Sequence, residues 1–262
     1  MKIVAMTCCV MDIFPQLNSQ CVGGNSVNFA IQCRKSGVGQ VAVLGAVGED
    51  VFGEEIISRL KEEKIDVSYL HMLEGYTATR VVMISEKGRR LFVPENWQGG
   101  VFETFELSPA DWDFVRGHDI IASVANDPNF SALLACKPDS SLLAIDFLNS
   151  RDLRFIHAHL PKIDISFIGG NRQIVKRLAP VSKKLKKLII VNMGSKGTVA
   201  ILNGETFFQE ALPVKEAVDT TGCGDAYLAA FSIDWNKYRD VRKALIAGAE
   251  AAARVMSHRG AV

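Results

Sequence analysis

The stretch from residue 219 to residue 227 reads DTTGCGDAY, and it decides the fold of this 262-residue chain. Gly222 and Gly224 allow the backbone to turn tightly and to approach a ligand closely. The apolar segment Ala226–Phe231 follows at once and is typical of a helix. The glycines therefore lie where a helix begins. The exposed N–H groups at such a start, together with the positive end of the helix dipole, form a site for an anion.

Asp225 lies in the first turn of this predicted helix, beside the predicted anion site. A carboxylate in that position suits the removal of a proton from a hydroxyl group while that group attacks phosphorus. The alternative is that Asp219 or Asp225 only caps the helix. A cap accounts for one aspartate but not for two around a Gly-x-Gly, so we interpret the stretch as a catalytic turn.

Composition narrows the class of protein. The length fits one large α/β domain, and a hydrophobic content of 48% is ample for a core. A formal net charge of +1 gives no reason to expect nucleic acid or an anionic membrane as a partner. No apolar run reaches the roughly 18 residues of a membrane span, and Asp12 interrupts the N-terminus before a signal peptide could form. The six cysteines include no C-x-x-C pair, which favours reduced thiols in the cytoplasm.

Short apolar runs alternate with helical patterns along most of the chain. This alternation predicts an α/β fold with a mostly parallel central sheet and helices on both faces. The dipeptide Asn203-Gly204 stands between two strand-like segments and predicts a type I′ hairpin. The runs of strand length are 3–7, 41–44, 120–124, 142–147, 163–168 and 188–193, and the helical patterns include 26–35, 129–136, 152–159, 171–178 and 241–256.

Two segments depart from this alternation. Residues 79–85 and 89–94 form a hairpin pattern without a partner helix. Residues 9–17 are also extended in character. We predict one domain, residues 1–262, with a small β lid formed by about 9–17 and 76–97. The alternative is an ordinary edge of the main sheet.

Polar residues near the N-terminus are candidates for substrate binding. Gly23 and Gly24 open the first predicted helix and allow a close approach of the backbone to a ligand. Asn28 follows about one turn later, on a face that could look back at the same ligand. Asp12 comes just after the first strand and could accept hydrogen bonds from two sugar hydroxyls. Each has a plain alternative, a capped turn for the glycines and a turn aspartate for Asp12.

A glycine-rich loop, Met193–Gly197, follows the apolar run 188–193. Such loops at the carboxyl ends of parallel strands hold nucleotides in α/β folds, although a plain β-turn is the alternative. The chain contains no Walker A sequence, and the first strand lacks the G-x-G-x-x-G of a nicotinamide dehydrogenase. In the predicted lid, Arg90 could meet an acidic group of a substrate or face water.

Taken together, these residues resemble the phosphofructokinase-B/ribokinase family of carbohydrate kinases. The stretch 219–227 is similar to the family's C-terminal signature, and Gly23–Asn28 is similar to its sugar-binding signature. The resemblance covers essentially the whole chain. It implies a ribokinase-like fold, catalysis by phosphoryl transfer, and a sugar and ATP as the small-molecule partners.

The resemblance also implies individual roles. Asp225 is the expected general base, and the backbone amides of Gly222, Cys223 and Gly224 are the expected anion hole for the transferring phosphoryl group. The residues expected to hold sugar hydroxyls are Asp12, Gly24 and Asn28, with Arg90 as a further candidate for substrate binding.

On the nucleotide side, the resemblance implies ATP with Mg²⁺, and a monovalent cation such as K⁺ held by the backbone around Asp219. The chain has Ile174 where relatives commonly carry a glutamate that organises magnesium. We therefore expect magnesium to be held mainly by ATP phosphates and water, which fits its reluctance to dehydrate. The residues expected to line the nucleotide are Asn171, Asn192, Gly194, Gly197 and Thr221.

The expected substrate is a fructose-like ketose, phosphorylated on its primary hydroxyl. Within the family, the stretch 12–18 and the ending 258–261 point to fructoselysine or a related sugar–amine adduct. Plain fructose, another sugar, or a nucleoside whose base stacks on Phe92 or Trp97 are the alternatives. A non-catalytic sugar sensor is the alternative from another class, but it would not need the intact Asp225. The exposed edges of a protruding lid would also suit a homodimer.

Overall fold

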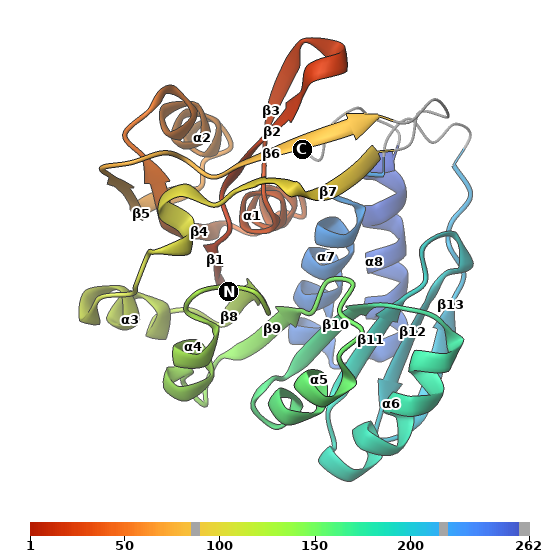
Figure 1. Ribbon diagram of the computed structural model, residues 1–262. Coiled ribbons are helices and arrows are strands. Elements are labelled where there is room, and N and C mark those ends of the chain that lie inside the picture. The colour runs from red at the N-terminus through yellow and green to blue at the C-terminus, as the bar shows by residue number, and fades with distance from the viewer. Residues whose placement is uncertain (85–89, 215–219, 257–262) are drawn as a thin grey trace.

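The computed structural model describes residues 1–84, 90–214 and 220–256, with side chains outside 84–95. A nine-stranded sheet runs through the centre of the molecule, and a four-stranded sheet lies above it (Figure 1). The central sheet has the order β13-β12-β11-β10-β9-β8-β1-β4-β5. Its strands are β1 (Lys2–Thr7), β4 (Gln40–Gly48), β5 (Asp66–Leu73), β8 (Ile120–Val124), β9 (Leu142–Asp146), β10 (Ile165–Gly169), β11 (Leu188–Asn192), β12 (Thr198–Leu202) and β13 (Glu205–Gln209).

Neighbouring strands of the central sheet are parallel from β5 through β11, and only the pairings of β11 with β12 and of β12 with β13 are antiparallel. The predicted mostly parallel sheet is therefore confirmed. Its inner strands are apolar runs buried on both faces, as parallel strands usually are. The predicted hairpin joins β12 to β13, where Asn203 and Gly204 have φ angles of 53° and 86°. Two positive φ angles in succession are the mark of a type I′ turn.

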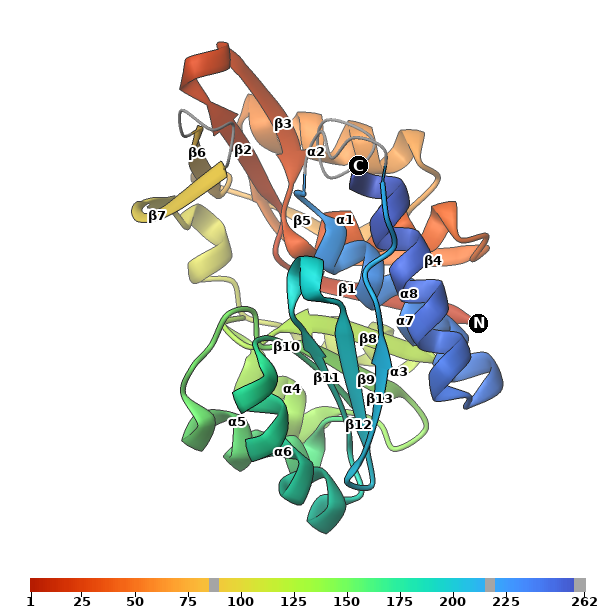
Figure 2. The ribbon, with the colours of Figure 1, turned by 90° about the vertical axis from the view of Figure 1, so that its right-hand side faces the viewer.

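Helices cover both faces of the central sheet (Figure 2). Alternate residues of β1 supply the two cores, because side chains along a strand point to opposite faces. Ile3 and Ala5 pack in one core, and Val4 and Met6 pack in the other. The first core includes α1 (Asn25–Lys35), α2 (Val51–Glu62), α7 (Cys223–Tyr238) and α8 (Val241–Met256), and the second includes α3 (Pro109–Arg116), α4 (Phe130–Cys136), α5 (Leu153–His159) and α6 (Arg172–Leu185).

The smaller sheet, called the lid sheet below, has the order β3-β2-β6-β7. It is a sheet of its own and not an edge of the central one. The sequence pattern did not predict β3, whose first residues are exposed and polar, and residues 15–17 form a short 3₁₀ helix instead of extended chain. The strands of the lid sheet are β2 (Val10–Phe14), β3 (Ser19–Gly23), β6 (Thr79–Ile84) and β7 (Arg90–Gln98). The 3₁₀ helices among the described residues are η1 (Pro15–Leu17), η2 (Gly100–Glu103), η3 (Leu160–Lys162) and η4 (Gly194–Lys196).

The strand order fixes where a ligand site belongs. After β1 the chain builds β4 and β5 on one side of it, and then β8 to β11 on the other. The order of strands therefore reverses between β1 and β8, and ligands of open α/β sheets bind at the carboxyl edge near such a point. The lid sheet emerges from the carboxyl ends of β1 and β5, so it lies over that edge. Among the helices of the described residues, none has the length and apolar character that crossing a membrane requires.

Candidate active site

The first catalytic candidate, Asp225, lies at the start of α7. Gly222 is the residue before the helix and has a φ of 75°, a left-handed conformation that glycine adopts without strain. The Ala226 amide donates to the Gly222 carbonyl at 2.8 Å, which closes the first turn. Asp225 lies in this turn and is only 7% exposed. The glycines therefore mark the start of a helix, as predicted, and the helix buries a carboxylate in its first turn.

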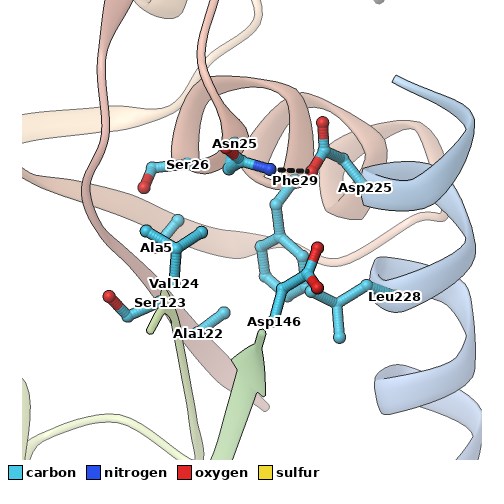
Figure 3. Close-up of a pocket in the computed structure, with 10 residues that line it drawn as sticks. All are labelled: Ala5, Asn25, Ser26, Phe29, Ala122, Ser123, Val124, Asp146, Asp225 and Leu228. Atoms are coloured by element: carbon cyan, nitrogen blue, oxygen red, sulfur yellow. Dashed lines mark hydrogen bonds between the residues drawn. The ribbon is translucent and has the colours of Figure 1, made fainter. Parts of the chain in front are cut away.

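Two asparagines of α1 hold the Asp225 carboxylate. The Asn25 side-chain amide donates to Oδ1 at 2.9 Å, and the Asn28 side-chain amide donates to Oδ2 at 2.8 Å. Figure 3 shows Asn25 reaching toward Asp225 from the neighbouring helix. The Asn28 Oδ1 atom is buried and has no hydrogen-bond partner among the residues that the structure describes. A hydroxyl group entering here would find acceptors on both Asp225 and Asn28.

The surroundings of Asp225 bring its pKa close to neutrality. Burial raises the pKa of this carboxyl group to about 7, and the negative charges of Asp146 and Asp12 act in the same direction. The hydrogen bonds from Asn28 and Asn25 oppose the rise, because they favour the charged form. A general base works best when its pKa lies near the operating pH. A carboxyl group with this pKa can take up a proton near neutral pH, and the role of Asp225 as general base stays a prediction.

Asp146 is a second carboxylate of the site, and the sequence analysis missed it. It ends β9, and Figure 3 shows it facing the same small pocket as Asp225. Its Oδ1 accepts a hydrogen bond from the Leu148 amide at 2.7 Å, and burial raises its pKa to about 6. The available signal was a single carboxylate at the end of an apolar run, on the edge of the sheet where ligands bind.

A larger cavity of about 410 Å³ adjoins the small pocket. Its size lies within the range of about 300–1,000 Å³ that is typical of small-ligand sites. Asp146 lines both cavities and so stands at their junction. The larger cavity brings together three predicted residues, Asn192, Gly194 and Gly224, and it adds Arg151, which the sequence analysis did not single out.

The predicted nucleotide residues differ in what the structure shows of them. The Asn192 Oδ1 atom accepts a hydrogen bond from the Gly194 amide at 2.8 Å, and both residues face the larger cavity. Asn171 caps α6, since its Oδ1 accepts hydrogen bonds from the first amides of that helix. A Cβ on Gly197 would lie 2.3 Å from the Gln209 carbonyl oxygen, so the approach of β13 requires glycine there. Contacts of these residues with a nucleotide stay predictions.

The paired glycines let α1 approach the base of the lid sheet. Gly24 has a φ of 96°, and a Cβ there would lie 2.3 Å from the Cys8 carbonyl oxygen. A Cβ on Gly23 would lie 2.9 Å from Oδ2 of Asp12. Asp12 itself is 5% exposed and lies on β2. The close approach at these glycines is thus to the protein's own chain, and it draws Asp12 toward the start of α1.

The predicted anion hole lies at the start of α7. The first amides of a helix have no partner within the helix, although here the Cys223 amide donates a long hydrogen bond of 3.4 Å to the Thr220 carbonyl. Thr221 is half-buried just before this turn, and its predicted nucleotide role stays a prediction. Asp219, with the K⁺ site predicted around it, and the side chain of Arg90 lie outside the described residues.

Comparisons with known proteins give the family of this chain. The profile of the pfkB family of carbohydrate kinases matches residues 16–168 and 147–262. The chain is 27% identical over 254 residues to fructoselysine 6-kinase of Escherichia coli (strain K12), which covers 96% of this chain and 95% of that protein. It is 24% identical over 273 residues to fructosamine kinase FrlD of Bacillus subtilis (strain 168), covering 100% and 93%.

The fold is similar to that of solved sugar kinases. The structure of Arabidopsis thaliana ribokinase complexed with ribose and ATP matches with a TM-score of 0.83 and 21% identity. The match covers 99% of this chain and 93% of the ribokinase chain. The predicted ribokinase-like fold is confirmed.

Proposed function

Because the chain belongs to the pfkB family of carbohydrate kinases, we propose that it transfers a phosphoryl group from ATP to the primary hydroxyl of a fructose-like ketose, with fructoselysine or a related sugar–amine adduct as the substrate. A carbohydrate kinase is a phosphotransferase with an alcohol as acceptor. One observation carries the proposal: a buried carboxylate, Asp225, has a pKa of about 7, lies in the first turn of a helix and lines the small pocket, next to Gly224, which lines the larger cavity.

Asp225 removes the proton of the attacking hydroxyl. A carboxylate offers about four lone-pair sites, and the hydrogen bonds from Asn25 and Asn28 use two of them. The remaining sites can accept the hydroxyl proton. The buried Oδ1 of Asn28 can accept a hydrogen bond from a neighbouring sugar hydroxyl, which orients the substrate before reaction.

The start of α7 stabilises the negative charge of the phosphoryl group. Amide N–H groups and the helix dipole point toward this position before the substrate arrives, so little reorganisation is needed during reaction. Arg151 adds a cation to the larger cavity, where its guanidinium donates a hydrogen bond to the Gly169 carbonyl. An arginine fixed in this way suits the planar recognition of phosphate oxygens.

The residues at the junction of the two cavities fit a Mg²⁺ ion bound with ATP. When bound, Mg²⁺ would neutralise part of the negative charge of the phosphates. It prefers oxygen ligands and keeps several of its water molecules. Asp146 offers such an oxygen at the junction. Within the described ranges, no group of three or more His, Cys, Asp or Glu side chains could hold a metal. Phosphate oxygens and water would therefore complete the shell.

The lid sheet closes the sugar side of the site in this proposal. It brings Asp12 over the start of α1, where the carboxylate can accept hydrogen bonds from sugar hydroxyls. A cover over the reacting atoms excludes water and so prevents the hydrolysis of ATP in place of sugar phosphorylation.

A substrate panel tests this function. ADP release is measured with fructoselysine, other fructose–amine adducts, fructose, ribose and a set of nucleosides. We expect the highest kcat/KM with the adducts, since both relatives described above act, by name, on such compounds. A higher kcat/KM for fructose or a nucleoside would contradict the substrate assignment. Sugar binding without ADP release would support the sugar-sensor alternative and contradict the enzymatic function.

A further inference from the structure

The inner face of the lid sheet carries a row of four side chains, one from each strand. Asp12 on β2 is paired with Cys21 on β3 and with Arg80 on β6, and Arg80 is paired with Trp97 on β7. Residues paired across strands point to the same face of a sheet. A carboxylate, a guanidinium and an indole ring therefore follow one another across this face.

Arg80 and Trp97 form a fixed unit in this row. The Arg80 guanidinium carbon lies 5.2 Å from the centre of the Trp97 ring, a cation–π geometry. The Trp97 indole nitrogen donates to the Glu103 carboxylate at 2.7 Å, and the ring meets Phe102 edge-on at 5.8 Å. The hydrogen bond to Glu103 and the contact with Phe102 thus fix the position of the Trp97 ring beneath the guanidinium. A cation positioned in this way loses little conformational freedom when it binds a ligand.

This unit faces the sugar side of the site. Trp97 packs against a small apolar cluster that includes Cys8, just after β1, and Val124 at the end of β8. Burial raises the pKa of the Cys8 thiol to about 11, and the positive charge of Arg80 opposes that rise. The Cys8 thiol in turn contacts the side chain of Asn25, which holds Asp225. The Arg80–Trp97 unit is therefore connected through Cys8 and Asn25 to the Asp225 carboxylate.

We propose that Arg80, held on Trp97, binds the carboxylate carried by the amine half of a sugar–amine substrate, while Asp12 beside it binds the sugar hydroxyls. The inference rests on the proposed function, and it names the part of the lid that recognises the amino-acid portion. A neutral hexose has no anionic group for a guanidinium, whereas an amino acid joined to the sugar through an amine keeps its carboxylate. Arginine matches a carboxylate with two parallel hydrogen bonds.

The geometry disfavours two other uses of this unit. A nucleoside base would have to stack on Trp97, but the guanidinium already covers a face of that ring. A phosphate of ATP would approach from the larger cavity, and no residue of the row lines that cavity. Of these three ligands, the carboxylate of the acceptor substrate fits the unit best.

The test uses two substrates that differ only in this carboxylate. One is fructoselysine, and the other is the fructose adduct of cadaverine, which is lysine without its carboxylate. For the wild-type enzyme we expect kcat/KM to favour fructoselysine by about 10- to 100-fold, the range expected for a charge-assisted hydrogen bond. In Arg80→Met the ratio is expected to fall to about 1. In Arg80→Lys it should lie in between, because an ammonium keeps the charge but loses the planar fork.

Arg242→Met is the matched control. Arg242 also lies over an aromatic ring, at 5.1 Å from the centre of Phe207, but it belongs to α8 and not to the lid sheet. This variant should keep the wild-type ratio. An Arg80→Met enzyme that keeps the ratio would overturn the inference and leave the proposed function intact. A raised KM for ATP with an unchanged ratio would do the same. A wild-type enzyme that phosphorylates fructose but neither adduct would contradict both.

If Arg80→Met folds poorly, Arg80→Lys gives the same comparison. The ratio is measured within one preparation, so partial loss of folded protein does not alter it. A ratio in Arg80→Lys equal to that of the wild type would count against the bidentate contact.

Discussion

In the proposed function, the start of α7 and the inner face of the lid sheet serve the same site, but the two regions are built in different ways. At α7, a turn of consecutive residues, Gly222 to Asp225, supplies both the helix amides and the carboxylate. On the lid sheet, Asp12, Arg80 and Trp97 come from three strands and meet only through the pairing register. The first region is continuous in sequence, and the second exists only in the folded chain.

This difference assigns different tasks to the two regions. In the proposed function, the α7 turn acts on the groups that every substrate of a sugar kinase shares, a hydroxyl and a phosphoryl group. In the further inference, the lid row binds the part of the acceptor that distinguishes one substrate from another. Changes at α7 should therefore lower the rate with all sugars, and changes in the lid row should alter the selectivity among sugars. The following predictions test whether the two regions separate in this way.

The largest effect is expected at Asp225. We predict that Asp225→Asn lowers kcat by at least about 100-fold with every accepted sugar, because the variant has the shape of the base but cannot take a proton. ATP binding should survive, since the amides at the start of α7 remain. Steady-state kinetics with several sugars and the titration of ATP binding provide the measurements.

Asp234→Asn is the control for this variant. Asp234 lies on the same helix but does not line either cavity, so its change should leave kcat near the wild-type value. An Asp225→Asn enzyme with near-normal kcat would remove Asp225 from the role of base. A loss confined to one sugar would contradict the separation of tasks between α7 and the lid row.

The two regions also differ in how far the sequence predicts them. The start of α7 follows from a local signal, glycines before an apolar helical run. The contact of Asn28 with Asp225 joins two helices that are far apart in the sequence, and the sequence analysis did not predict it. The inner strands were predicted because strands buried on both faces are continuous apolar runs. The edge strand β5 was missed, since only Leu70 is buried in it and its pattern is half polar. The row of Asp12, Arg80 and Trp97 on the lid sheet could not be predicted. The pairing register of strands that are far apart in the sequence cannot be inferred from the sequence of any single strand.

A second, intermediate effect concerns pH. The folded pKa of Asp225 is about 7, so the protonated, inactive form dominates below that value. We predict that kcat/KM rises about tenfold per pH unit up to about pH 7 and then levels off, because this profile reports the base of the free enzyme. This rise of kcat/KM below pH 7, called the acid limb, should appear with every accepted sugar, since the base belongs to the shared part of the site.

Asp146→Asn sharpens this prediction. After burial, the negative charge of Asp146 is among the causes that raise the pKa of Asp225, so its removal should move the acid limb to lower pH. The position of the limb does not depend on how far the substitution lowers the rate itself. A limb that stays in place or moves to higher pH would show that the two carboxylates are not coupled as described. Lid variants such as Arg80→Met should leave the shape of the limb unchanged.

The smallest effect concerns the anchoring of the lid and not its chemistry. Asp50 caps α2 by accepting from the Gly53 amide at 2.8 Å, and it also accepts from the amide and hydroxyl of Thr77, at 2.8 and 2.6 Å, just before β6. We predict that Asp50→Ala lowers the free energy of unfolding by about 2 kcal/mol, because a cap is lost and the buried Thr77 loses acceptors. Asp152→Ala removes only the cap of α5 and should cost about 1 kcal/mol. Denaturant titration measures both. Equal losses would mean that Thr77 adds nothing to the anchor, and a changed substrate selectivity in Asp50→Ala would mean that the anchor sets the geometry of the lid row.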